Sequence, residues 1–191
     1  KKGQKVAAKR SDRDAAEGLV LAKSTTDGKR AVLMVLNCET DFVAKNDQFG
    51  TLANTILDVA INNNPNNVEE LKAMTFTGSD LSIGDKLIEE IGKIGEKIDL
   101  SAFETVSAEK VTAYNHPGNK LASIVGFTAD AGEDVGRDVA MQVAAMAPVA
   151  VTPETIPADL IEKEREIGKD LAIQEGKPAE MAEKIAEGRV K

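Results

Sequence analysis

TDGKRAVLMVL, at residues 26–36, sets the architecture of this chain. Asp27-Gly28 is a strong hairpin signal because both residue types accept the positive φ angles of a tight turn. Residues 18–23 before the turn are mostly apolar, and residues 31–36 after it form an unbroken apolar run. Such a run is typical of a strand buried on both faces, so the second strand is expected at the centre of a sheet.

Two helices are expected after this hairpin. An apolar stripe at helical spacing runs from Phe49 to Ala60, Asn46 or Asp47 is placed to cap it, and loop residues 62–65 end it. A second apolar stripe predicts another helix over Ile83 to Ile98.

The same plan appears again further along the chain. Strand-like residues 105–114, a turn at 115–119 and an apolar strand at 121–127 precede an acidic loop and a helix. The apolar face expected for that helix carries Val135, Val139, Val143, Met146 and Ala147. Hairpin, loop and helix in two copies predict two related subdomains. The first copy has the longer loop, and its extra residues fall at 40–43, where function is commonly added.

The character of the sequence changes at Thr152. A charged helix is expected next, followed by the stop-and-restart signal EGKP at 175–178 and a second helix. The residues expected to form the seam between the two helices are Leu160, Ile161, Ile167, Leu171, Met181, Ala182 and Ile185. The pattern predicts an antiparallel helical hairpin that projects from the core.

The predicted fold class is therefore α+β: two related subdomains, each a β-hairpin or antiparallel sheet packed by helices, plus the helical hairpin. The predicted division is an N-terminal linker or helical remnant at 1–16, an N-subdomain at 17–104, a C-subdomain at 105–151 and the hairpin at 152–191. Both ends of the chain look cut, so a fragment is expected.

Composition argues against several classes of function. The formal net charge is −8, from 32 acidic and 24 basic residues, whereas nucleic-acid binding depends on basic side chains. The single cysteine, Cys38, fits a reducing cytoplasm. No apolar run approaches the length of about 18 residues that a membrane span needs. We therefore expect a cytoplasmic protein without nucleic-acid or membrane contacts.

The sequence offers little for catalysis. One histidine and one cysteine nearly exclude a His/Cys metal site or a Cys–His pair, and no nucleotide-binding motif is present. Cys38 is expected to be a small core residue, and His116 an exposed turn residue whose contact role stays open. We expect no enzyme, no cofactor and no metal. A small-molecule enzyme using scattered carboxylates and a purely structural helical module are the alternatives.

The segment Asn37–Phe49 remains as the candidate site. Either Phe42 or Val43 packs under the following helix as a hydrophobic staple, or Phe42 stands exposed beside Asp41 as an anchor for a partner's pocket. The residues alone leave both interpretations open.

Residues 37–46, NCETDFVAKN, with Phe49 following, resemble the signature of the bacterial elongation factor Ts family. Similar features run in the same order: Glu17-Gly18, IGEKI at 94–98, Tyr114-Asn115-His116, GKP at 176–178 and IAEGR at 185–189. The resemblance covers essentially the whole chain. It implies a core fragment that lacks the family's N-terminal helical domain and its C-terminal module.

The resemblance implies a guanine-nucleotide exchange factor that promotes GDP release from the GTPase elongation factor Tu in translation elongation. Thr40-Asp41-Phe42-Val43 matches the loop that, in the family, enters the GTP-binding domain and helps to dislodge its magnesium ion. Tyr114-Asn115-His116 matches a turn expected near another domain of the GTPase. The implied partner is GDP-bound elongation factor Tu, and the seam of the helical hairpin implies self-association, as in some relatives.

Overall fold

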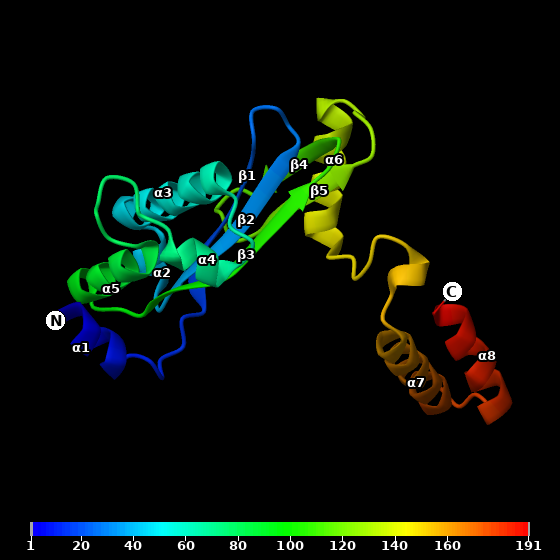
Figure 1. Ribbon diagram of the computed structural model, residues 1–191. Coiled ribbons are helices and arrows are strands. Elements are labelled where there is room, and N and C mark those ends of the chain that lie inside the picture. Colours follow the sequence, from blue (N-terminus) through cyan, green and yellow to red (C-terminus); the bar gives the residue numbers. More distant parts are fainter. Residues whose placement is uncertain (1, 191) are drawn as a thin grey trace. The chain divides into compact units, whose positions relative to one another are not determined.

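The computed structural model describes residues 2–190, which form helices and two antiparallel sheets (Figure 1). This mixture agrees with the predicted α+β class. Contacts between residues divide the chain into two compact units, residues 1–146 and 147–191.

The first unit is built on a three-stranded antiparallel sheet. Its strands are β1 (Glu17–Ser24), β2 (Arg30–Cys38) and β3 (Ile98–Ser107), in the order β1-β2-β3. The predicted hairpin and the central position of its second strand are confirmed. Burial is uneven, however: alternate residues of β2 are fully buried, whereas Leu33 and Val35 between them are only half-buried.

Helices lie on one face of this sheet and close a core with it (Figure 1). They are α3 (Asp47–Asn63), α4 (Val68–Ala73) and α5 (Ile83–Ile94), and α1 (Lys2–Lys9) contacts α5. The largest fully buried apolar side chains are Val32, Met34, Leu36, Phe49, Ile56, Leu71, Ile83 and Leu100. Because they join strands and helices in one cluster, the sheet and its helices form a single stable platform.

The predicted cap of α3 is confirmed, but the predicted end of the next helix is wrong. Asn46 accepts a hydrogen bond from the backbone N–H of Gln48 at 2.8 Å. Helix α5 ends at Ile94 rather than Ile98, because Gly95 takes a left-handed conformation at φ 83° and its N–H bonds to the Ile91 carbonyl. Ile98 then begins β3, a strand that the sequence pattern placed later in the chain.

A second hairpin of β4 (Lys110–Asn115) and β5 (Ala122–Phe127) is followed by α6 (Glu133–Met146). The expected strand-like run at 105–114 is in fact the end of β3 and nearly all of β4. The structure thus has hairpin and helix where the second copy was expected, and the relation between the two subdomains stays a prediction. Since β3 pairs with β2 up to Ser107, Thr105 belongs to the first sheet.

Most of the inward face predicted for α6 is wrong, although Val143 is half-buried. Gly136 and Ala140 are buried, whereas Val135, Val139 and Met146 are exposed. The helix packs on β4 and β5 through small residues, which let it approach the strands closely and leave its larger side chains outside.

The second unit contains α7 (Ala158–Gln174) and α8 (Ala179–Arg189), preceded by the short 3-10 turn Pro153–Thr155. The two helices contact each other along their length. Ion pairs Lys169–Glu183 at 3.7 Å and Arg189–Glu164 at 3.9 Å show that they run antiparallel.

The seam predicted between α7 and α8 holds only in part: Ala182 is buried and Leu160 and Ile161 are half-buried, but the other predicted residues are exposed. The buried residues are Gly168, Ala172, Ala182 and Ala186. A Cβ added at Gly168 would lie 3.3 Å from the Cα of Ala186, so the backbones approach too closely for large side chains. The large apolar residues left exposed on the two helices are Ile167, Leu171, Ile173, Met181 and Ile185.

Candidate functional site

The candidate tip is a single helical turn, α2 (Asp41–Ala44), between β2 and α3. Thr40 is its N-cap: the hydroxyl accepts a hydrogen bond from the Val43 N–H at 3.4 Å. Asn46 caps α3 directly afterwards, so two helix starts follow each other within a few residues. The sequence pattern predicted a loop here and missed α2, although Thr40 followed by Asp41 is a helix-start signal.

Phe42 is the exposed residue of this turn. Its exposed fraction is 83%, whereas Val43 packs against the core from a half-buried position and Ala44 is buried. The structure contains a part of each interpretation that the residues left open: Val43 packs against the core, and Phe42 is exposed. Aromatic side chains are among the residues that commonly serve as anchors in protein interfaces.

Asp41 and Lys45 form an ion pair at the side of the tip. The Lys45 Nζ lies 2.7 Å from the Asp41 Oδ2, one helical turn apart. The hydrogen bond and the charge of Lys45 lower the pKa of the Asp41 carboxyl. Asp41 is therefore an anion at neutral pH, and it is accessible to a partner.

Two carboxylates hold the residues that precede α2. Glu39 accepts two hydrogen bonds from the Arg10 guanidinium, at 2.8 and 2.7 Å, and one from the Lys97 backbone N–H at 2.6 Å. The bond from Lys97 and then those from Arg10 lower the pKa of Glu39. Glu96 accepts from Thr40. The end of β2 is thus tied to the loop after α5 and to the segment after α1.

The second predicted segment, Tyr114-Asn115-His116, divides into two roles. The Tyr114 hydroxyl lies 2.8 Å from Nδ1 of His116, and the two rings are tilted against each other. The Asn115 amide instead bonds to both the N–H and the carbonyl of Ala22, at 2.8 and 2.9 Å. Asn115 therefore anchors β4 to β1, which the sequence pattern did not reveal, while Tyr114 is half-buried and His116 is exposed.

The turn after His116 lies close to the tip. Asn119 accepts a hydrogen bond from the Val20 N–H at 2.7 Å. It also lines an open groove together with residues 44–47 and one side of α3. The structure thus places Asn119 next to the tip, whereas Tyr114 and Asn115 lie beside the turn between β1 and β2.

Comparison with known proteins identifies the family of this chain. A family model described as Elongation factor TS matches residues 39–191. Proteins named Elongation factor Ts are similar over the full length: that of Amoebophilus asiaticus is 46% identical, and that of Flavobacterium psychrophilum 47%. Each alignment covers 100% of this chain and 69% of the relative. This chain belongs to the elongation factor Ts family.

Membership places the chain among the elongation factors of protein biosynthesis. The family match begins at Glu39 and therefore includes the whole tip. Within residues 2–190, no helix has the length and apolar character needed to cross a membrane.

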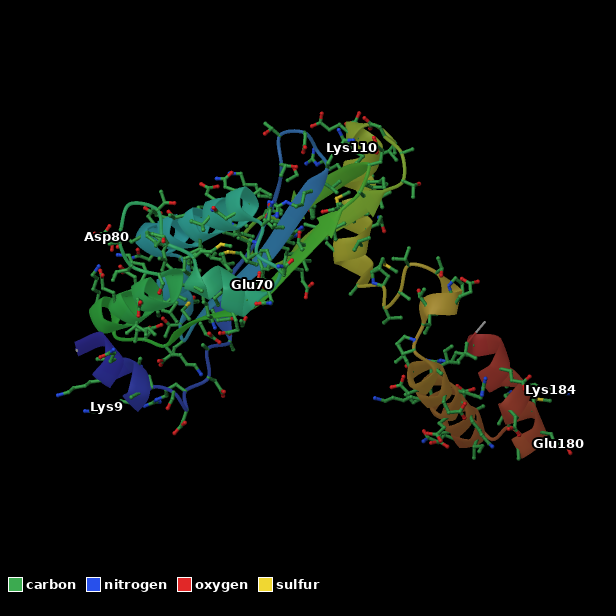
Figure 2. The ribbon with its side chains drawn as sticks, viewed as in Figure 1. Lys9, Glu70, Asp80, Lys110, Glu180 and Lys184 are labelled. Atoms are coloured by element: carbon green, nitrogen blue, oxygen red, sulfur yellow. The ribbon has the colours of Figure 1, made fainter. Side chains whose placement is uncertain are left out.

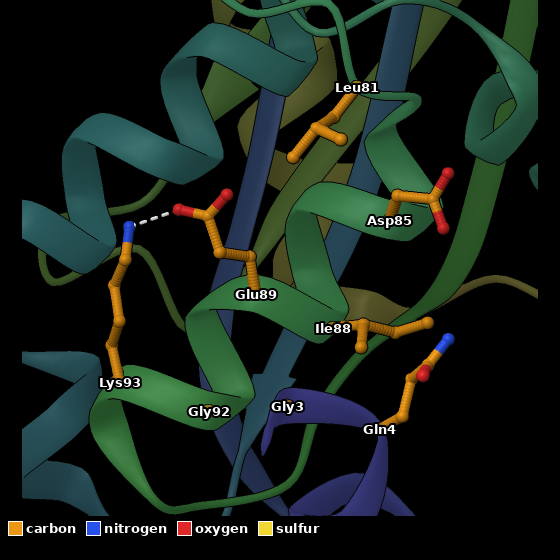
Figure 3. Close-up of a pocket in the computed structure, with 8 residues that line it drawn as sticks. All are labelled: Gly3, Gln4, Leu81, Asp85, Ile88, Glu89, Gly92 and Lys93. Carbon is orange, nitrogen blue, oxygen red and sulfur yellow. Dashed lines mark hydrogen bonds and ion pairs between the residues drawn. The ribbon is translucent and has the colours of Figure 1, made fainter. Parts of the chain in front are cut away.

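This elongation factor Ts family member also has a pocket away from the tip segment. The pocket between α1 and α5 is lined by Gly3, Gln4, Leu81, Asp85, Ile88, Glu89, Gly92 and Lys93 (Figure 3). Its Glu89 is paired with Lys93. In the described part of the chain, no three His, Cys, Asp or Glu residues are grouped to bind a metal ion. Charged side chains such as Lys9, Asp80 and Lys184, labelled in Figure 2, are exposed.

Cys38 is the last residue of β2, just before the tip, and is fully buried. The prediction that it is a core residue is therefore confirmed. Its thiol donates to the Thr40 carbonyl, with the sulfur 3.2 Å from the oxygen. Burial, and then the negative charge of Glu96, raise the pKa of the thiol to about 11. The thiol is therefore protonated at neutral pH and is unsuited to act as a nucleophile.

Alkylation of Cys38 should report on the integrity of this region. At pH 8 the shifted pKa leaves about 100-fold fewer thiolates than an ordinary cysteine has, and burial slows the reaction further. We expect iodoacetamide to modify the folded chain at least about 100-fold more slowly than the chain in denaturant. Mass spectrometry gives both rates, and Cys38→Ala supplies the background. Equal rates would contradict the buried position.

Proposed function

We propose that this chain promotes GDP release from elongation factor Tu by placing Thr40-Asp41-Phe42-Val43 beside the bound nucleotide and its Mg²⁺. The observation that carries the proposal is the 83% exposed Phe42 on a capped, anchored turn. Membership of the elongation factor Ts family supports it, because the match to the family model includes these residues.

The residue types suit this task. A GTPase holds GDP with backbone amides, a lysine and a Mg²⁺ ion that bridges the phosphates. A rigid aromatic side chain such as Phe42 can displace a segment that lines this site. The Asp41 carboxylate brings a negative charge that disturbs the surroundings of the magnesium ion. No covalent bond is made or broken, so the chain acts as an exchange factor and not as an enzyme.

Release of the factor follows from thermodynamic linkage. If the factor weakens nucleotide binding, nucleotide must weaken binding of the factor by the same coupling free energy. Incoming GTP therefore dissociates the complex, and the factor acts again on another GDP-bound GTPase.

Further contacts belong to the same proposal. Tyr114 and His116 are proposed to touch a second domain of the GTPase, while Asn115 supports them from behind through its bonds to Ala22. Self-association through the helical hairpin stays a prediction, now with Leu171 and Met181 among the exposed residues that such contacts would use.

The decisive experiment measures release of fluorescent GDP from purified elongation factor Tu as the concentration of this chain rises. The proposal expects release to accelerate and to saturate. Since the tip is proposed to act partly through Mg²⁺, the acceleration factor should be smaller in excess EDTA, where the ion is already removed. An unrelated GTPase loaded with the same nucleotide is the control. Release that stays at its intrinsic rate would refute the proposal and favour a purely structural module.

A further inference from the structure

The loop between α5 and β3 reaches the candidate tip from a distant part of the sequence. Glu96, within the IGEKI motif at 94–98, accepts two hydrogen bonds from Thr40. The Thr40 backbone N–H bonds to Oε2 at 3.1 Å, and the Thr40 hydroxyl bonds to Oε1 at 2.7 Å. Each carboxylate oxygen thus has its own donor on a residue 56 positions away.

We propose that Glu96 is a positioning residue for nucleotide exchange, which fixes the direction of Phe42 by holding Thr40. This inference rests on the proposed function, because it explains how the tip is kept ready for the GTPase. Glu96 itself acts through Thr40 and need not touch the partner.

The hydroxyl of Thr40 links Glu96 to α2. Its single proton is donated to Glu96, which leaves its oxygen lone pairs for the N–H of Val43. The same side-chain torsion of Thr40 therefore allows both the hydrogen bond to Glu96 and the hydrogen bond that caps α2. Without that bond the hydroxyl is able to rotate, and the cap is lost for part of the time.

The tip needs such support because α2 cannot hold itself. A single helical turn is unfavourable in isolation, since ordering its backbone costs more than its few hydrogen bonds return. Phe42 points into solvent and gains nothing from the core, so only Val43 and Ala44 anchor the turn by packing. The orientation of Phe42 consequently depends on the polar contacts of Thr40.

Residues just before α2 also hold the loop that carries Glu96. The Glu39 carboxylate accepts from the Lys97 backbone N–H, so residues 39–40 and 96–97 bond to each other in both directions. Lys97 also donates to the backbone carbonyls of Ser11 and Arg13, at 2.9 and 3.0 Å. This reciprocal arrangement makes Glu96 a fixed support for Thr40.

The test compares Glu96→Gln with the natural chain in the GDP-release assay. Glutamine keeps the shape but turns an N–H group toward a donor of Thr40. We expect the maximal release rate to fall about tenfold, while the concentration for half-saturation changes by less than about twofold. Glu89→Gln is the matched control, because Glu89 on α5 pairs with lysines and lies outside the tip. An unchanged maximal rate in Glu96→Gln overturns the inference.

A combined variant separates positioning from any other role. In a Phe42→Ala background, Glu96→Gln should slow release no further, because both changes act through the same side chain. A further tenfold loss there contradicts the inference. If the natural chain fails to accelerate release at all, the proposed function fails instead, so the two failures are distinguishable.

Motion of the tip can be followed without the partner. The chain contains no tryptophan, so Phe42→Trp introduces a single fluorescent probe at the tip. Glu96→Gln should increase the fast local component of its anisotropy decay, whereas Glu89→Gln should leave it unchanged. Identical decays with and without Glu96 would show that Thr40 holds the tip alone and would overturn the inference.

Discussion

Phe42→Ala is expected to remove most of the acceleration of GDP release while leaving the stability of the chain unchanged. Phe42 is 83% exposed, so its removal creates no cavity. Exposed aromatic anchors that enter a partner's pocket commonly contribute 2 kcal/mol or more to recognition, which corresponds to a loss of about 30-fold. The fluorescent-GDP assay measures this loss directly, and thermal unfolding should shift by less than about 2 °C.

Another exposed apolar residue provides the control for Phe42→Ala. Val151 is 98% exposed and belongs to the other compact unit, so Val151→Ala removes exposed apolar surface without altering the unit that carries the tip. The Val151→Ala variant should accelerate GDP release from elongation factor Tu as much as the natural chain does. If both variants keep full activity, Phe42 is not the wedge. If Phe42→Ala also lowers the unfolding temperature strongly, the side chain is not free in solution.

Elements whose signals are local were predictable from the sequence. The Asp27-Gly28 turn and the apolar run after it specify the hairpin and the central strand, and Asn46 specifies the start of α3. The end of α5 was missed because the apolar stripe continues to Ile98, although Gly95 interrupts the helix. The left-handed conformation of Gly95 ends the helix before Ile98, so the helical spacing of the apolar residues did not predict where the helix stops.

Most of the large apolar residues predicted to face inward on α6, α7 and α8 are exposed, for one shared reason. An apolar stripe is normally read as the inward face because large side chains gain most from burial. Here the close contacts are made by glycine and alanine, such as Gly136, Gly168 and Ala186, and close backbone approach replaces interlocking of large residues. The large apolar side chains then lie beside the contact and stay exposed.

The sequence predicted where the candidate site lies, but not which of its residues is exposed or which hydrogen bonds hold it. The lengthened loop and the family signature both indicate residues 40–43. The exposure of Phe42 depends on Val43 packing inward, and hydrophobicity does not distinguish which of the two does so. The bonds from Thr40 to Glu96 and from Asn115 to Ala22 join residues far apart in sequence. Only the folded chain reveals such pairs, because no local pattern encodes them.

Phe49→Ala should have the opposite effect to Phe42→Ala, although the two residues lie on the same short stretch. Phe49 is 1% exposed and belongs to the core cluster between α3 and the sheet. Truncating a buried phenylalanine removes its transfer free energy and leaves a cavity, at a cost of about 3–5 kcal/mol in the free energy of unfolding. Because that is a large part of the stability of an ordinary domain, the first unit should unfold at a much lower denaturant concentration.

Pulsed alkylation of Cys38 across a urea series measures this effect, since the thiol reacts only when the first unit opens. The midpoint should fall clearly for Phe49→Ala, fall less for the more conservative Phe49→Leu, and stay unchanged for Phe42→Ala. At a temperature where Phe49→Ala is still folded, its GDP-release activity should be close to normal, because Thr40 and Glu96 still hold the tip. A midpoint unaffected by Phe49→Ala would mean that this ring does not support the platform on which the tip stands.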